Sequence, residues 1–306
     1  MTTTTLQKPS GQVSKLRGKD PKTAKPSKAK IIIYGPPGVG KTWTSIEFPS
    51  VYYIDTEGGA NREHYTDKLK AAGGVYMGQQ EGSLDFGTVL EQVHALATEK
   101  HEYRTLVLDS FTKLYNTEAA LAAERFVKAE KNPNAMGDEF GRDRKEANKP
   151  TRRLINWLNR LDMNVVLICH EKAQWLNGEQ AGFTFDGYDK LSYELDLTLH
   201  IQRRGDARVA VVKKTRLLGF PELSVFPWGY KEFSERYGRD VIETNVQAIT
   251  LASAEQVAEI KKLVETIRVS DEEMAKAFTK YGVSSFEEMD ADTIQASINN
   301  LKGKLK

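Results

Sequence analysis

The sequence predicts an α/β protein with a mainly parallel sheet and a small helical module at its C-terminal end. Short β-branched runs alternate with segments of helical periodicity, one run passes directly into a glycine-rich loop, and the composition shifts to amphipathic helical segments from residue 251. With 306 residues and 40% hydrophobic content, the chain is long enough to bury one full core and a small extra domain. We therefore divide it into a basic tail (1–29), a core (30–250) and a helical module (251–306).

The tail differs in charge from the rest of the chain. Residues 1–30, which are the tail and the first residue of the core, hold eight Lys or Arg against the single acid Asp20, so this segment carries about +7 and the remainder about −5. With threonines, prolines and few large apolar residues, it buries too little surface to offset the entropy of ordering, and we expect it to be disordered. Such an arm either contacts nucleic-acid phosphates or only improves solubility.

Cysteine usage and hydropathy restrict the class of protein further. Cys169 is the only cysteine, which excludes a disulfide framework and a cysteine-based zinc site. No apolar stretch approaches the roughly twenty residues that span a bilayer, and the N-terminus lacks the apolar centre of a signal peptide. These features predict a cytoplasmic protein with no membrane partner.

The glycine-rich loop predicts nucleotide binding. It follows the run 31–34 and reads Gly35-Pro36-Pro37-Gly38-Val39-Gly40-Lys41-Thr42. Glycines at this spacing let backbone N–H groups turn inward around a phosphate, Lys41 adds a cation, and the hydroxyl of Thr42 suits Mg²⁺. This is a P-loop, so the eight residues are candidate ligands of ATP, and Mg²⁺ is the expected metal. A helix from Lys41 to Phe48 is expected to follow.

Two further strands are expected to end in acids. Asp109 ends the apolar run 105–109, where a carboxylate holds Mg²⁺ opposite Thr42 as the Walker B residue. Ser110 then occupies the place where many P-loop ATPases have a catalytic Glu. Glu57 lies in the β-rich run 51–59, at the carboxyl end of the expected strand. It is therefore the candidate for orienting the attacking water, with a helix-capping role as the alternative.

The P-loop, Glu57 on the strand after the P-loop helix, and the Asp109-Ser110 pair together resemble the RecA superfamily, over residues 30–235. This resemblance implies a RecA-like core, ATP hydrolysis and assembly into a homo-oligomeric ring or filament. Within the superfamily, the compact core looks like the phage Sak-type single-strand annealing ATPases. For a phage-encoded protein, the compartment is the host cytoplasm.

The resemblance also assigns roles to two later segments. His170 follows the strand 164–169, where RecA-like proteins place a polar residue that senses the γ-phosphate; a structural role is the alternative. Strands 195–202 and 208–213 are expected around a turn at 203–206. The basic residues after them resemble a finger that reaches a neighbouring subunit's ATP, with a solvated basic turn as the alternative. The finger candidates are Lys213, Lys214 and Arg216.

In the RecA fold, the segments after the Walker B strand and after the sensor strand line the DNA channel. Here we expect two long loops, 127–153 and 172–191. Basic residues that follow a backbone and aromatic residues that stack on bases are what sequence-tolerant single-strand binding requires. The alternatives are basic residues on a helix surface and aromatic residues packed on the core. The candidate DNA-binding residues are Lys128, Arg142, Arg144, Lys145, Arg152, Arg153, Trp175 and Phe183.

Capping-box patterns predict the helices of the module. Gly282 is expected to end the second helix, and residues 293–301 to form another. The segment 281–289 resembles the terminal modules with which phage recombination proteins dock, which implies a recombination or single-strand-binding protein as partner. The three patterns are Ser253 with Gln256, Ser270 with Glu273, and Ser285 with Glu288.

These features together predict an ATP-dependent, single-stranded-DNA-binding recombination protein that promotes annealing or strand exchange as an oligomer. A helicase or loader of the same fold, and a nucleotide-switched adaptor without enzymatic activity, are the alternatives. A small-molecule kinase is disfavoured, because a phosphate-acceptor pocket normally brings an Arg-rich lid.

Overall fold

A computed structural model describes residues 20, 26–59, 61–129 and 142–305 of the chain, without the side chains of residues 126, 129 and 142–145. The strands are β1 (Lys30–Tyr34), β2 (Val51–Asp55), β3 (Val75–Met77), β4 (Thr105–Asp109), β5 (Asn164–Cys169), β6 (Glu171–Leu176), β7 (Glu179–Phe185), β8 (Leu197–Arg204), β9 (Ala207–Thr215) and β10 (Val225–Pro227). The core helices are α1 (Lys41–Ser45), α2 (Glu63–Ala71), α3 (Phe86–Thr98), α4 (Phe111–Ala129), α5 (Arg142–Arg160), α6 (Leu191–Glu194), α7 (Tyr230–Tyr237) and α8 (Arg239–Glu243), with a 3₁₀ turn η2 (Gln79–Glu81).

Within the described part of the chain, eight strands form one sheet in the order β10-β9-β8-β1-β5-β4-β2-β3. The strands from β8 to β3 are parallel, whereas β9 and β10 run antiparallel to their neighbours. The P-loop strand β1 therefore lies inside the sheet, between β5 and β8. Tyr34 pairs with Cys169, and Asp55 with Asp109, so the residues that follow these strands meet at one edge.

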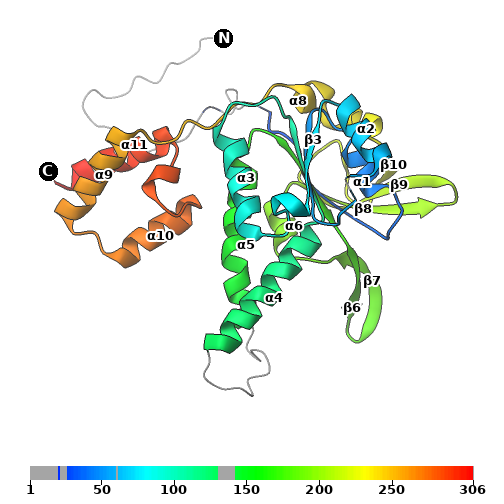
Figure 1. Cartoon of the computed structure of the whole chain (residues 1–306), viewed down its shortest axis with the longest axis horizontal. Helices are drawn as coiled ribbons and strands as arrows, with labels where there is room; N and C mark the ends of the chain where they lie inside the picture. Colours follow the sequence, from blue (N-terminus) through cyan, green and yellow to red (C-terminus); the bar gives the residue numbers. More distant parts are fainter. Residues whose placement is uncertain (1–19, 21–25, 60, 130–141, 306) are drawn as a thin grey trace, which may run out of the picture.

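Helices cover both faces of this sheet. Side chains alternate along β1, so that Ile32 and Tyr34 enter one apolar cluster while Ile31 and Ile33 enter the other. The first cluster includes residues of α3 and α5, and the second includes residues of α7 and α8. Figure 1 shows the sheet between α3 and α5 on one side and α1 and α2 on the other. The predicted fold class is confirmed as an α/β core with a mainly parallel sheet and a small C-terminal helical module.

The strands predicted around the P-loop are confirmed at 51–55, 105–109 and 164–169. The helix predicted over 41–48 ends earlier, at Ser45. The two strands predicted around residues 203–206 form the β8–β9 hairpin, in which Arg204 already pairs with Ala207. The turn is therefore tighter than expected.

The prediction of a long loop over residues 127–153 is wrong, because most of this segment is helical where the structure describes it. Helix α4 extends to Ala129, and α5 begins at Arg142 and continues through Pro150. Proline inside a helix removes a hydrogen bond and costs about 3 kcal/mol. Helix α5 nevertheless buries an apolar stripe that includes the fully buried Trp157, packed against α3 and α4. This burial offsets the cost of the proline.

The prediction of a loop over residues 172–191 is also wrong, because β6 and β7 form an antiparallel hairpin there. Asn177 and Gly178 make the turn with φ values of 53° and 85°. Positive φ at both positions is the type I′ turn that Asn-Gly favours in two-residue hairpins. The hairpin starts directly after β5 and projects away from the main sheet (Figure 1).

The module consists of α9 (Ala254–Ile267), α10 (Asp271–Tyr281), a 3₁₀ turn η3 (Phe286–Glu288) and α11 (Ala291–Lys304). The capping boxes at Ser253 and Ser270 are confirmed, and Gly282 ends α10 with a φ of 66°. The third box is wrong. Ser285 precedes only η3 and makes no side-chain cap, because the carboxylate of Glu288 accepts the backbone N–H of Ser284 at 2.7 Å instead.

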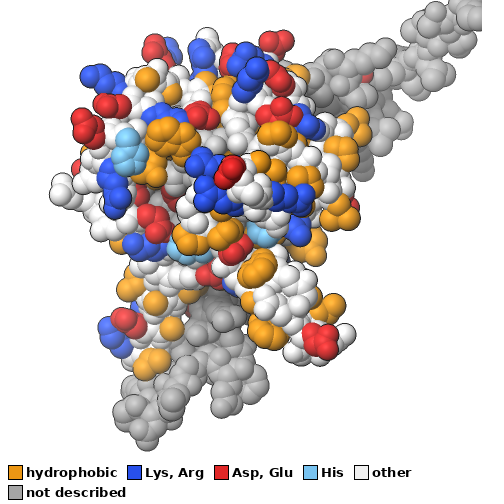
Figure 2. Space-filling model, turned by 90° about the vertical axis from the view of Figure 1, so that its right-hand side faces the viewer, with side chains coloured by type: hydrophobic (Ala, Val, Ile, Leu, Met, Phe, Trp, Pro, Cys, Tyr) orange, Lys and Arg blue, Asp and Glu red, His pale blue; other side chains and the backbone are white. Residues whose placement is uncertain are grey.

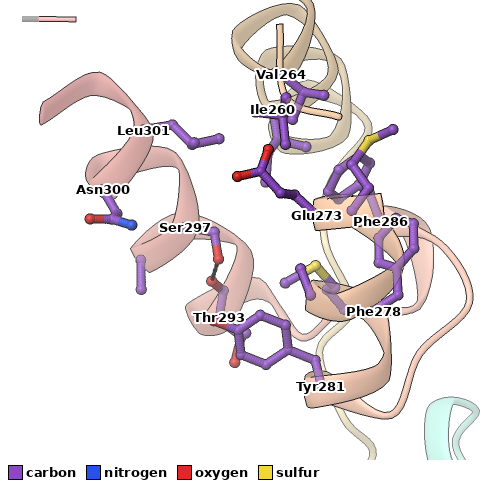
Figure 3. A pocket seen from close by; sticks show the side chains of 15 residues that line it. Ile260, Val264, Glu273, Phe278, Tyr281, Phe286, Thr293, Ser297, Asn300 and Leu301 are labelled. Atoms are coloured by element: carbon purple, nitrogen blue, oxygen red, sulfur yellow. Dashed lines mark hydrogen bonds between the residues drawn. The ribbon is translucent and has the colours of Figure 1, made fainter. Parts of the chain in front are cut away.

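The module has its own apolar cluster and contacts the core through α5. Arg153 of α5 pairs with the Glu288 carboxylate, and Arg160 donates to the Glu288 carbonyl at 3.2 Å. Between α9, α10 and α11 lies a pocket of about 310 Å³. Figure 3 shows its mostly apolar lining, into which Glu273 extends its carboxylate. Within the described residues, no helix combines the length and apolar character needed to cross a membrane.

Candidate nucleotide-binding site

A pocket of about 660 Å³ opens beside the P-loop, where β1, β2, β4 and β5 end. Asp109, Glu57 and His170 line it together with part of the P-loop. The predicted P-loop residues at its wall are Gly35, Pro37, Gly38, Lys41 and Thr42. Gly40 instead lines a smaller adjoining pocket, and Val39 is buried in the core.

Backbone geometry explains why the loop needs glycine. Gly38 and Gly40 have φ values of 77° and 83°, a region that other residues rarely adopt. The Lys41 ammonium donates hydrogen bonds to the carbonyl oxygens of Gly35 at 2.7 Å and Pro36 at 2.9 Å. Burial lowers the pKa of Lys41, and the nearby Asp109 carboxylate opposes that shift. The cation is thus held at the wall of the pocket.

Asp109 lies at the centre of the candidate metal site. Its Oδ2 accepts hydrogen bonds from the hydroxyls of Thr42 at 2.5 Å and Tyr53 at 3.0 Å. Burial raises the pKa of Asp109 to about 6, against the effect of these two hydrogen bonds. A hydroxyl and a carboxylate side by side are oxygen ligands of the kind that Mg²⁺ prefers, so the pair fits the ion. Tyr53 was not predicted, although it lies two residues before Asp55 and so on the same face of β2.

Glu57 is held by two side chains from neighbouring strand ends. The Ser110 hydroxyl donates to Glu57 Oε1 at 2.5 Å, and His170 Nε2 lies 3.0 Å from the same oxygen. Burial acts to raise the pKa of Glu57, but the hydrogen bond from Ser110 and the proximity of His170 outweigh it, and the pKa is lowered. Asp55 fixes the turn, because its Oδ1 accepts the backbone N–H groups of Glu57 and Gly58, each at 2.9 Å. The carboxylate is therefore ionised and positioned over the pocket.

A second group of polar residues, missed at the level of sequence, lies beside the P-loop strand. The Glu171 carboxylate is 3.0 Å from Nε2 of the buried His200, whose ring stacks on Tyr34 with centroids 4.5 Å apart. Burial lowers the pKa of His200, and Glu171 opposes this shift. The Tyr34 hydroxyl donates to the Phe183 carbonyl at 3.2 Å. These contacts join the β6–β7 hairpin to β1 and β8, and a sequence pattern could not show them because they depend on strand order.

The predicted finger residues do not line the nucleotide pocket of their own chain. In the β8–β9 register, Lys214 pairs with Thr198. Thr198 lies two residues before His200, which pairs with Tyr34 at the end of β1 that leads into the P-loop. Lys214 donates to a backbone carbonyl of its own chain, and Arg216 lies 3.5 Å from Asp196. Lys213 is exposed.

The candidate DNA-binding residues are scattered over different elements. Lys128 is exposed at the end of α4, 3.9 Å from Glu124. Arg152 donates to the Tyr188 hydroxyl at 3.2 Å, and Arg153 is engaged by Glu288. The side chains of Arg142, Arg144 and Lys145 lie outside the described residues, as does most of the basic tail.

The hairpin β6–β7 carries the exposed aromatic candidates. Trp175 and Phe183 are 65% and 44% exposed. Phe185 and Tyr188, two other aromatic residues of the same segment, are buried in the core, as the alternative interpretation held. Residues 27–29, which we placed in the tail, contact the core, since Lys28 donates to the Val241 carbonyl at 2.7 Å and Ala29 is fully buried.

The fold and this site define a P-loop NTPase. The chain belongs to a family described as an AAA domain, whose model matches residues 27–218. Among solved structures, the chain is similar to the crystal structure of the RadB recombinase, with 18% sequence identity, a TM-score of 0.42, and coverage of 67% of this chain and 90% of that one. No curated protein matches the chain.

Proposed function

We propose that this protein is an ATP-dependent, single-stranded-DNA-binding recombination protein that promotes annealing or strand exchange as a homo-oligomer. The observation that carries the proposal is the arrangement of Glu57, Ser110 and His170 beside the Asp109–Thr42 pair. An ionised carboxylate at this place is suited to orient the water that attacks the γ-phosphate. Lys41, Thr42 and Asp109 would hold Mg·ATP, which supplies the phosphoryl group.

The position of the β6–β7 hairpin supports DNA binding. It begins at Glu171, directly after His170, and exposes Trp175 and Phe183. Exposed aromatic faces stack on unpaired bases without regard to sequence. Because His170 contacts Glu57, a strand bound to the hairpin would lie close to the group that controls hydrolysis. This proximity favours an ATPase that responds to DNA.

Two surfaces support the proposed homo-oligomer and the proposed protein partner. Leu218 is completely exposed and Leu223 is 71% exposed, in the loop that follows the basic residues 213–216. Apolar groups beside these cations favour a subunit interface that brings Lys213, Lys214 and Arg216 to a neighbour's ATP. The apolar pocket of the module would take apolar side chains of a recombination or single-strand-binding protein.

The test is ATP hydrolysis by the wild type and Glu57→Gln, each with and without single-stranded DNA, beside a DNA-binding titration. Single-stranded DNA should raise the wild-type rate, and Glu57→Gln should abolish turnover while keeping ATP-dependent DNA binding. Glu102→Gln, an exposed position outside the pocket, is the matched control and should behave as wild type. If DNA changes neither the rate nor binding, the proposal fails in favour of a nucleotide-switched adaptor.

A further inference from the structure

The β8–β9 hairpin brings one arginine against the P-loop, although no sequence pattern marked it. Gly40 faces this hairpin, and a methyl group on Gly40 would lie 2.7 Å from Nη1 of Arg208. Arg208 lines a pocket of about 230 Å³ together with Trp43, Tyr65 and residues of the P-loop. It shares Gly38, Lys41, Thr42 and Tyr65 with the larger pocket described above. The guanidinium therefore stands at the same phosphate-binding loop as Lys41, on its other side.

The charged groups that the structure describes around Arg208 include no counterion for it. No carboxylate pairs with its guanidinium within the part of the chain that the structure describes. Arg203 lies directly opposite Arg208 in the antiparallel register. Side chains at directly opposed positions share one face, and like charges there are destabilising. An anion between the hairpin and the P-loop would relieve this repulsion.

Two other arginines of the core are paired with carboxylates. Arg236 is paired with Glu232 at 2.8 Å, and Arg216 with Asp196 at 3.5 Å. Figure 2 looks at the side of the molecule from which the hairpin projects and shows Lys and Arg side chains gathered near its centre. Arg203, Arg204 and Arg208 are all exposed on the hairpin. Arg204 follows Arg203 in β8, so its side chain leaves from the opposite face.

We propose that Arg208 is a phosphate-binding residue of the nucleotide site, acting within its own subunit and assisted by the positive potential of Arg203. This inference rests on the proposed function only in that the P-loop must bind nucleotide. Glu57 and His170 define the γ-phosphate end of the pocket, whereas Arg208 approaches the loop from the side of Gly40. The phosphate chain would lie between Lys41 and Arg208, and binding would draw the hairpin onto the P-loop.

Calorimetric titration of ATP, ADP and inorganic tripolyphosphate into the wild type, Arg208→Gln and Arg204→Gln tests this assignment. A lost charge-assisted hydrogen bond should weaken the binding of all three ligands by about tenfold in Arg208→Gln. Arg204→Gln removes the same charge from the same hairpin on the other face and should bind as the wild type does. Arg208→Lys, which keeps the charge but not the planar fork, should lose less than the Gln variant.

Two results would overturn the assignment. Wild-type affinities in Arg208→Gln would remove any role of the residue in binding. Weaker ATP and ADP binding with unchanged tripolyphosphate binding would place the contact on the nucleoside instead of the phosphates. Thermal unfolding of each variant, compared with the wild type, excludes misfolding as the cause. Failure of the wild type to bind any of these ligands would be failure of the proposed function itself, whereas lack of DNA stimulation would leave the Arg208 assignment standing.

Discussion

Ser110 donates a 2.5 Å hydrogen bond to the carboxylate of Glu57, across the ends of β4 and β2. The residue after Asp109, the candidate Walker B aspartate, thus holds the candidate catalytic glutamate instead of replacing it. A hydroxyl donor stabilises the ionised carboxylate, and this is one reason why the pKa of Glu57 is lowered despite its burial.

Replacing Ser110 with Ala should therefore change the pH dependence of hydrolysis. Glu57 must be ionised to accept a hydrogen bond from the attacking water, so activity falls as pH drops through its pKa. Loss of the hydroxyl raises that pKa, and the acidic limb of the kcat profile should move to higher pH. Steady-state ATPase assays from about pH 4 to 8 measure the limb. An unchanged limb in Ser110→Ala would show that another group controls it.

Binding of single-stranded DNA should depend on the exposed aromatic residues of the β6–β7 hairpin, Trp175 and Phe183. Trp175→Ala and Phe183→Ala are each expected to weaken binding of an oligothymidine by about tenfold, since stacking of one base contributes about 1–3 kcal/mol. Fluorescence anisotropy with a labelled oligonucleotide measures the dissociation constant. Tyr193→Ala is the matched control, because this side chain is 74% exposed but lies in α6, outside the hairpin. Equal losses in all three variants would contradict a specific role for the hairpin.

Lys30 should make the stability of the fold rise with pH above neutrality. Its buried ammonium donates to the carbonyls of Leu161 and Met163, both at 2.8 Å. Burial lowers its pKa to about 7, against the pull of Asp162 and Asp196. Between about pH 7 and the unfolded value of 10.5 the unfolded chain binds the extra proton, so the free energy of unfolding increases with pH.

Lys30→Met should remove this contribution to the pH dependence of the free energy of unfolding, which amounts to up to about 1 kcal/mol per pH unit. Urea unfolding of the wild type and the variant between about pH 7 and 9 gives the difference. Lys100→Met, at an exposed position, should leave the slope unchanged. Parallel curves for the wild type and Lys30→Met would mean that Lys30 keeps an ordinary pKa in the folded protein.

Gly282 is expected to be indispensable at the end of α10. Its φ of 66° strains any other residue, and a methyl group would lie 2.5 Å from Nδ2 of Asn156 in α5. Gly282→Ala should therefore lower stability by about 1–2 kcal/mol and loosen the contact between module and core. Gly303→Ala in α11 meets no atom within 4 Å and should be neutral or stabilising. Thermal unfolding and limited proteolysis compare the two, and equal behaviour would refute the packing argument.

Some features were predictable because they depend on short stretches of chain. The P-loop spacing, the strands ending at Asp109 and Cys169, and the caps at Ser253 and Ser270 follow from local backbone chemistry and periodicity. The β6–β7 hairpin was also within reach, since Asn177-Gly178 is a strong turn signal. It was missed because the surrounding residues resembled a basic and aromatic loop.

Local sequence alone thus determined the class of fold, the phosphate-binding loop and the candidate carboxylates, because each is encoded within a few neighbouring residues. Only the tertiary structure decided which side chains meet. Arg153 faces Glu288, and Arg208 faces Gly40, since the order and register of distant strands and helices set those contacts. Helix α5 likewise passes through Pro150 because burial of its apolar stripe against α3 and α4 outweighs the local preference of one residue.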